Sequence, residues 1–132
     1  MLKHAKAVSG FAVDDMSRAK EFYGSTLGLD VADAALGVDG ADVPAGLELH
    51  LGSGTRVLVY PKPDHTPATF TILNFIVEDI ERAVDALTAR GVRFEHYDSP
   101  KTDAKGIHRT PEVQPVAWFQ DPAGNILSII QE

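Results

Sequence analysis

The stretch Phe11-Ala12-Val13-Asp14-Asp15-Met16-Ser17-Arg18-Ala19 recurs later in the chain as Phe75-Ile76-Val77-Glu78-Asp79-Ile80-Glu81-Arg82-Ala83. Six of the nine positions carry the same residue or the same kind of apolar residue: Phe11/Phe75, Val13/Val77, Asp15/Asp79, Met16/Ile80, Arg18/Arg82 and Ala19/Ala83. Two further matches follow in the same order, Gly28–Val31 with Gly91–Phe94 and Gly52–Thr55 with Pro122–Asn125. Because self-similarity at a fixed period marks a repeated structural unit, the chain is predicted to contain two copies of one module.

Each copy begins with the pattern of a strand followed by a helix. The predicted strands, Val8–Val13 and Phe70–Val77, are rich in β-branched and aromatic residues. An aspartate then stands where a helix N-cap is expected, because its short side chain accepts a hydrogen bond from the first helical turn. Apolar residues recur at helical spacing in both copies: Met16, Ala19, Phe22 and Tyr23, then Ile80, Ala83, Val84 and Leu87. Gly28 and Gly91 are predicted to end the two helices in a left-handed conformation.

The rest of each copy is predicted to be a short strand, a long loop and a hairpin. The short strands are Leu29–Val31 and Val92–Tyr97, the loops are Ala32–Gly46 and Asp98–Pro115, and the hairpins are Leu47–Leu51 with Val57–Tyr60 and Val116–Gln120 with Ile126–Ile130. The fold class is therefore α+β, with two tandem βαβββ modules. Module 1 spans 1–62, a Pro-rich linker spans 61–67 and module 2 spans 68–132. Since about 65 residues are marginal alone, the modules are expected to form a single domain, 1–132.

Composition indicates a folded domain and excludes several classes of function. Of the 132 residues, 44% are hydrophobic and 23% are charged, which excludes a disordered chain. The chain has no cysteine, so disulfides and cysteine-ligated metals are excluded, and a reducing cytoplasmic location is expected. A net charge of −7 would repel a phosphate backbone, which argues against nucleic acid as a partner. No apolar run reaches the ~18 residues of a membrane span, so no membrane partner is expected.

The duplicated βαβββ pattern resembles the vicinal oxygen chelate superfamily. The resemblance rests on the Asp-capped helix that reaches Phe22-Tyr23 and on Asp121-Pro122-Ala123-Gly124-Asn125 before the last strand, and it covers nearly the whole chain. That superfamily includes glyoxalase I, extradiol dioxygenases, fosfomycin resistance enzymes, methylmalonyl-CoA epimerase and bleomycin resistance proteins. The resemblance implies mixed sheets that curve into a cup, with helices on the convex face and the ligand inside. It also implies a homodimer.

In the enzymes of that superfamily, His, Glu or Gln side chains hold a divalent metal on the cup floor. By resemblance, the four ligand positions in this chain are occupied by Val8, Leu58, Ile72 and Ser128. Aliphatic side chains and a hydroxyl do not supply the imidazole or carboxylate lone pairs that Zn²⁺, Ni²⁺, Mn²⁺ or Fe²⁺ require. A shift of one residue brings in no such ligand either. The sequence therefore predicts that the usual metal site is absent and that no cofactor is bound.

Strand alternation predicts which side chains face the cup if the four ligand positions do. The polar and aromatic members of this set suit a small-molecule site with few polar groups. The predicted ligand-binding residues are Glu48, His50, Arg56, Leu58, Tyr60, Ile72, Asn74, Trp118, Gln120 and Ser128. For Asn74, contact with a ligand and a structural hydrogen bond to a neighbouring strand are both open. His50 and Glu48 can also be interpreted as an exposed pair on one strand, and Arg56 can be interpreted as a solvated side chain.

Three functions follow from this pattern. The first is a metal-independent protein that binds or sequesters a small, partly apolar ligand, as bleomycin resistance proteins do. The second is a glyoxalase-type lyase or a dioxygenase with a rebuilt metal site, or an enzyme in which Glu48, His50 or Tyr60 performs acid–base catalysis without metal. The third is a degenerate paralogue with a structural or regulatory role. His108 and Arg109, in the second long loop, are additional candidates for gripping an anionic ligand.

Overall fold

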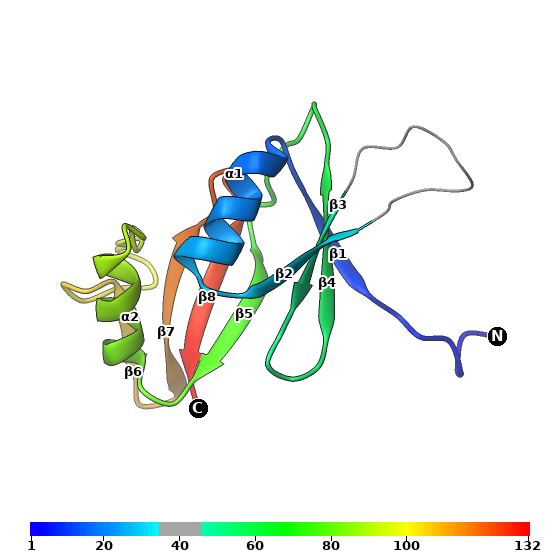
Figure 1. Cartoon of the computed structure of the whole chain (residues 1–132). Coiled ribbons are helices and arrows are strands. Elements are labelled where there is room, and N and C mark those ends of the chain that lie inside the picture. The colour runs from blue at the N-terminus through cyan, green and yellow to red at the C-terminus, as the bar shows by residue number, and fades with distance from the viewer. Residues whose placement is uncertain (35–45) are drawn as a thin grey trace. The chain divides into compact units, whose positions relative to one another are not determined.

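A computed structural model of the chain describes residues 1–34 and 46–132, which form two compact units, Met1–His65 and Thr66–Glu132. The boundary between the units falls inside the predicted linker 61–67. Figure 1 shows the order of the elements along the chain. No helix among the described residues is long and apolar enough to cross a membrane.

The first unit is a four-stranded mixed sheet with one helix. Its elements are β1 (Ser9–Val13), α1 (Met16–Glu21), the π-helical turn η1 (Phe22–Thr26), β2 (Asp30–Ala34), β3 (Gly46–His50) and β4 (Arg56–Pro61). The strand order is β1-β4-β3-β2. The first strand pairs in parallel with the last, and the other pairs are antiparallel.

The second unit repeats this arrangement. Its elements are β5 (Thr71–Val77), α2 (Ile80–Ala89), β6 (Ile107–Thr110), β7 (Val113–Gln120) and β8 (Ile126–Gln131). The strand order is β5-β8-β7-β6, and β5 pairs in parallel with β8. Two βαβββ units with the same strand order confirm the duplication and the predicted α+β class.

The two helices begin in the same way. Asp15 (φ −133°, ψ 105°) and Asp79 (φ −135°, ψ 101°) have the same extended backbone. Each carboxylate accepts a hydrogen bond at 3.1 Å from a backbone N–H in the first helical turn, that of Arg18 in α1 and of Arg82 in α2. The predicted N-caps are thus confirmed, and each fixes the step from opening strand to helix.

The predicted helix ends and hairpin turns are also confirmed. Gly28 (φ 73°) and Gly91 (φ 94°) follow the helices in the left-handed region. In the β3–β4 turn Gly54 has φ 83°, and in the β7–β8 turn Gly124 has φ 86°. The second turn is braced by Asp121, whose buried carboxylate accepts hydrogen bonds at 2.9 Å from two backbone N–H groups and from the side-chain amide of Asn125.

Each unit has its own core between the sheet and its helix. In the first, Tyr23 is fully buried, and its ring lies 5.7 Å from that of Phe11. In the second, the rings of Phe94 and Phe119 lie 5.5 Å apart. The other fully buried apolar side chains alternate along the strands or line the helices: Val13, Leu47, Leu49, Val59, Ile80, Ile107, Ala117, Leu127 and Ile129. Burial of this apolar surface stabilises each unit.

The structure corrects the sequence prediction at the second strand of module 2. The segment Val92–Tyr97 is not a strand: Phe94 forms one bridge with Phe119, and the N–H of Glu95 donates to the carbonyl of Trp118 at 2.8 Å. The strand is β6, inside the predicted loop Asp98–Pro115. The reason is that β7 is longer than either neighbour, so that β6 pairs with its first part and residues 94–95 bond to its last part.

Two boundaries in module 1 also differ. The strand β2 extends to Ala34, so the predicted loop Ala32–Gly46 begins in a strand, and the rest of that loop lies largely outside the described residues. The helix does not end as a regular α-helix, because the N–H of Leu27 donates to the carbonyl of Phe22 at 2.8 Å, five residues back. This π-helical turn places Tyr23 in the core.

Replacing Gly106 tests the close contact between the β6 loop and residues 94–95. Gly106 has φ +87°, and a Cβ there would lie 2.9 Å from the Phe94 Cβ and 3.0 Å from the Glu95 carbonyl oxygen. Gly91 also has a positive φ but has open space around it. We expect Gly91→Ala to cost about 1–2 kcal/mol from backbone strain alone, and Gly106→Ala to cost at least ~1 kcal/mol more. Urea unfolding measures both, and equal costs would contradict the contact.

Candidate functional site

The sheet of the second unit turns one face to its helix and leaves the predicted ligand residues on the other. Strand pairing places Asn74, Ser128 and Trp118 side by side on β5, β8 and β7. Their neighbours Ala117, Phe119, Leu127 and Ile129 point to the helix side and are buried. The structure therefore brings these three predicted residues together as a row across the sheet.

Trp118 lies at the centre of an aromatic cluster. Its ring is 5.6 Å from that of Tyr97 in an edge-to-face arrangement and 6.1 Å from that of His108. Trp118, Tyr97 and His108 are all half-buried. Burial, and secondarily the charge of Glu95, raises the pKa of the Tyr97 phenol, which keeps it neutral. An aromatic ring held in place by two others and still open to solvent suits stacking of a planar ligand.

Asn74 and Ser128 are linked by a hydrogen bond. The Ser128 hydroxyl, fully buried, donates to the Asn74 side-chain carbonyl oxygen. Of the two alternatives for Asn74, the structure thus shows the bond to the neighbouring strand. This bond leaves the Asn74 amide N–H groups directed away from Ser128 on a residue that is itself exposed. The Asn74 amide can therefore still donate hydrogen bonds to a ligand.

Ile72 and Gln120 lie further along the same sheet. The pairing of β5 with β8 shifts between Thr71 and Leu73, so Ile72 is the extra residue of a β-bulge. Gln120 is paired with Ile126 and is exposed. Regular alternation does not hold across a bulge, and the sequence pattern contains no signal for one at Ile72.

In the first unit, the predicted residues form a charged cluster with an apolar neighbour. The Glu48 carboxylate lies 3.0 Å from the His50 Nε2 and 3.4 Å from the Arg56 guanidinium. Glu48 is paired with Leu58 across the strands, and His50 is paired with Arg56. All three charged or ionisable side chains are partly exposed, so each ion pair contributes little to stability. Tyr60, two residues beyond Leu58, is exposed on the same face.

The loop that carries His108 is built around Asp103. The Asp103 carboxylate accepts hydrogen bonds at 2.9 Å from the backbone N–H groups of Lys105 and Ile107, and lies 3.6 Å from Arg109. Partial burial acts to raise the pKa of Asp103, but the two backbone hydrogen bonds and Arg109 together hold it below its ordinary value. His108 is tied down by its Nδ1, which is 2.7 Å from the Lys101 carbonyl oxygen.

Arg109 lies on the helix side of the second unit. Its guanidinium is 3.6 Å from Glu81 of α2, while Lys105 is 3.0 Å from Asp85 on the same helix. The His108 ring lies beside that of Trp118, whereas Arg109 is engaged with Asp103 and Glu81. Both residues nevertheless line one cavity of about 260 Å³. The hypothesis that His108 or Arg109 grips an anionic ligand therefore stays a prediction.

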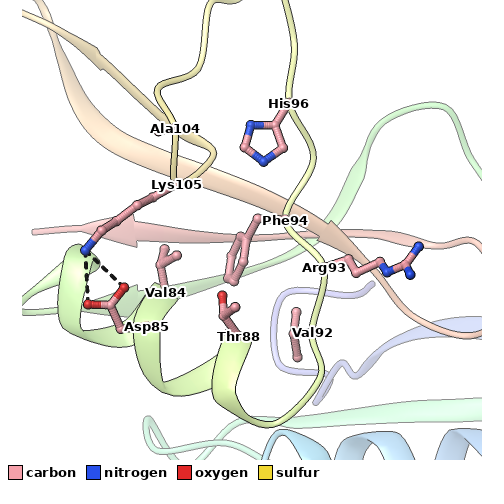
Figure 2. A pocket seen from close by; sticks show the side chains of 9 residues that line it. All are labelled: Val84, Asp85, Thr88, Val92, Arg93, Phe94, His96, Ala104 and Lys105. Carbon is pink, nitrogen blue, oxygen red and sulfur yellow. Dashed lines mark hydrogen bonds and ion pairs between the residues drawn. The ribbon is translucent and has the colours of Figure 1, made fainter.

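A cavity of about 440 Å³ lies on that helix side, between α2 and residues 92–105 (Figure 2). Val84, Val92 and Phe94 form its buried floor. Figure 2 shows the Lys105–Asp85 ion pair at one end and the His96 ring at the other. The hydrogen bond to Asp85 raises the pKa of Lys105. This cavity is separate from Asn74, Trp118 and Ser128, which lie on the other face of the second unit's sheet.

Comparison with protein families identifies the chain. The model of the Glyoxalase/Bleomycin resistance protein/Dioxygenase superfamily matches residues 2–129. The chain belongs to this superfamily. The resemblance predicted from the repeat and its motifs is thereby confirmed.

Several solved structures share the fold of this chain. An antibiotic-binding protein, TnmS3, from Streptomyces sp. CB03234 is 27% identical, with 97% of each chain covered and a TM-score of 0.67. A superfamily member from Sphaerobacter thermophilus is 25% identical, with 96% of this chain and 98% of that chain covered and a TM-score of 0.70. The fosfomycin resistance protein FosX from Listeria monocytogenes, 8% identical with a TM-score of 0.68, covers 97% of this chain and 93% of its own and shares the fold alone. Comparison with curated proteins gives no match.

The residues at the superfamily's metal positions do not fit a metal. Leu58 and Ile72 are half-buried aliphatic residues, and Val8 is an exposed one just before β1. Ser128 has its hydroxyl committed to Asn74. Among residues 1–34 and 46–132, no three His, Asp or Glu side chains are grouped so as to hold a metal ion. No chemical step through a metal is derived for this chain.

Sequence reasoning missed Tyr97 and the position of His108. Both come from the segment predicted as a strand and a loop, and both reach Trp118 only because two segments bond to one edge of β7. The available signal was alternation in residues 92–97, where Val92 and Phe94 are apolar and Tyr97 falls on the opposite face. No comparable pattern in the sequence predicts that β6 pairs with β7.

Asp103→Asn tests whether this aspartate organises the β6 loop. A carboxylate whose folded-state pKa is lowered stabilises the fold above its unfolded-state pKa, near 3.9, and this contribution disappears as the pH falls through the lower folded-state value. We expect the free energy of unfolding of the variant to be about 1–2 kcal/mol lower than that of the parent at pH 7. Between pH 5 and pH 3, the free energy of unfolding should fall less in the variant than in the parent. Urea unfolding at each pH measures this. Asp98→Asn is the control for net charge, and identical pH profiles for the parent and Asp103→Asn would contradict the assignment.

Proposed function

We propose that this superfamily member binds or sequesters a small, partly apolar molecule without the usual metal ion. The observation that carries the proposal is Trp118, an exposed-edge aromatic ring braced by Tyr97 and His108 beside the hydrogen-bonded pair Asn74–Ser128. A mostly apolar surface with a few fixed polar groups is the usual composition of a small-molecule site. The relative TnmS3, described as an antibiotic-binding protein, supports this function.

The proposed ligand-contacting residues come from both units. Those of the second unit are grouped around Trp118, and those of the first unit surround the Glu48 carboxylate. Together they are Glu48, His50, Arg56, Leu58, Tyr60, Ile72, Asn74, Trp118, Gln120 and Ser128.

Three further properties belong to the proposal. The two units act as a single domain, the protein is a homodimer, and it is located in the cytoplasm. The absence of cysteine supports a reducing compartment. Light scattering after gel filtration tests the dimer, and a mass of one chain would contradict it.

Thermal-shift screening tests ligand binding. The probes are bleomycin, fosfomycin, catechol, an α-keto aldehyde–thiol adduct and a set of aromatic and cationic antibiotics. A ligand present at 100 times its Kd stabilises the native state by about 2.7 kcal/mol, which raises Tm by about 10 °C in a domain of this size. Trp118 is the only tryptophan, so its fluorescence reports binding at this surface directly. If no probe changes Tm or the tryptophan fluorescence, the binding function is contradicted and a structural or regulatory role is favoured.

Substitution of Trp118 tests its stacking role with the probe that gives the largest shift. We expect Trp118→Leu to raise Kd about tenfold, because an aromatic pair contributes about 0.5–1.5 kcal/mol beyond its buried area. Phe70→Leu, which removes an exposed aromatic ring just before β5, is the matched control and should leave Kd unchanged. Metal analysis of the purified protein completes the test, since stoichiometric Ni, Zn, Mn or Fe would overturn the metal-independent proposal.

A further inference from the structure

We propose that the ligand of the second unit is a planar aromatic molecule with a hydroxyl group that donates a hydrogen bond to the His108 Nε2. This inference rests on the proposed function and specifies the chemical class of its ligand. It follows from the way His108 is held and from its position beside Trp118.

The contact with Lys101 determines which His108 nitrogen carries hydrogen. The Nδ1 lies 2.7 Å from the Lys101 carbonyl oxygen, and a carbonyl oxygen only accepts hydrogen bonds. Nδ1 is therefore the protonated nitrogen, and in the neutral imidazole Nε2 carries a lone pair. No hydrogen-bond partner of the His108 Nε2 is found among the residues that the structure describes. His108 thus offers a fixed hydrogen-bond acceptor.

The acceptor lies at the edge of the stacking surface. His108 is paired with Val116 across β6 and β7, and Val116 is two residues before Trp118 on the same face of the strand. The two rings are 6.1 Å apart with planes at 37°. A flat ring stacked on Trp118 would therefore bring a substituent at its edge within reach of the imidazole.

The hydrogen-bonding character of the His108 Nε2 determines which substituent of an aromatic ligand it favours. A neutral Nε2 accepts hydrogen and repels the lone pairs of a carboxylate, an ether or a carbonyl, so it favours a phenolic O–H. The Tyr97 ring also lies beside Trp118, at 5.6 Å, and burial raises the pKa of its phenol, which is therefore uncharged. The surroundings of the ring therefore favour an uncharged aromatic alcohol over an aromatic acid.

A matched pair of small probes tests the inference. Titrations with 2-naphthol and with 2-methoxynaphthalene are followed by the ¹H–¹⁵N resonance of the indole N–H, of which the chain has one. We expect 2-naphthol to bind 5- to 10-fold more tightly, the fold-change that corresponds to one neutral hydrogen bond of about 1 kcal/mol. Equal Kd values would overturn the inference while leaving the proposed binding function intact. If neither probe moves the indole resonance, the stacking surface itself is contradicted, and the proposed function with it.

Substitution of His108 identifies the acceptor. In His108→Leu the preference for 2-naphthol should fall to a ratio near 1, with little change in the Kd of the ether. The matched control is His96→Leu, because His96 is another histidine of the second unit but borders the cavity on the helix side (Figure 2). This control should keep the preference. If His108→Leu still binds 2-naphthol more tightly than 2-methoxynaphthalene, another group accepts the hydrogen bond and the proposal is overturned. If the variant does not fold, the ratio of the two Kd values in the parent protein still tests the preference for a hydroxyl group.

Discussion

The hydrogen-bonding edge of β7 is the constraint on which the candidate site depends. One strand of eight residues provides backbone partners for two segments that are far apart in the loop, β6 along its first part and residues 94–95 near its end. Since backbone N–H and C=O groups near a core must be paired, both segments are held at this edge. Tyr97 and His108 follow from these two attachments, and each reaches the Trp118 ring from its own segment.

The two units share a fold but carry different chemistry on the sheet face away from the helix. In the first unit this face holds the Glu48 carboxylate with His50 and Arg56 around it. In the second it holds aromatic rings and a buried hydroxyl–amide pair. Strand order, helix caps and turns are the same in both, because they depend on backbone geometry and on residues that face the helix. Function in such a fold is determined by the side chains on the open face.

The positions that the resemblance assigns to metal ligands carry three aliphatic side chains and a serine hydroxyl. Ser128 is the clearest case, because its buried hydroxyl is satisfied by Asn74 within the sheet. A buried polar group that is paired in this way stabilises the fold locally and is not available as a metal ligand. The binding function proposed for this face therefore relies on shape, stacking and a few hydrogen bonds.

The amino-acid sequence by itself determined the duplication, the capped helices, the glycine turns and the alternation that separates the core from the open face. These features are local: Asp15 and Asp79 bond to the next turn of their own helix, and Gly54 and Gly124 close their own hairpins. It also assigned Trp118, Asn74 and Ser128 to the open face, because side chains alternate along a strand. Only the tertiary structure decided that Ile72 lies in a bulge, that Arg109 faces α2, and that Tyr97 and His108 meet at Trp118. Those outcomes depend on which segment forms backbone hydrogen bonds with a given strand edge. Segments that are far apart in the chain compete for the same edge, so the pattern of any short stretch of sequence cannot predict which one pairs with it.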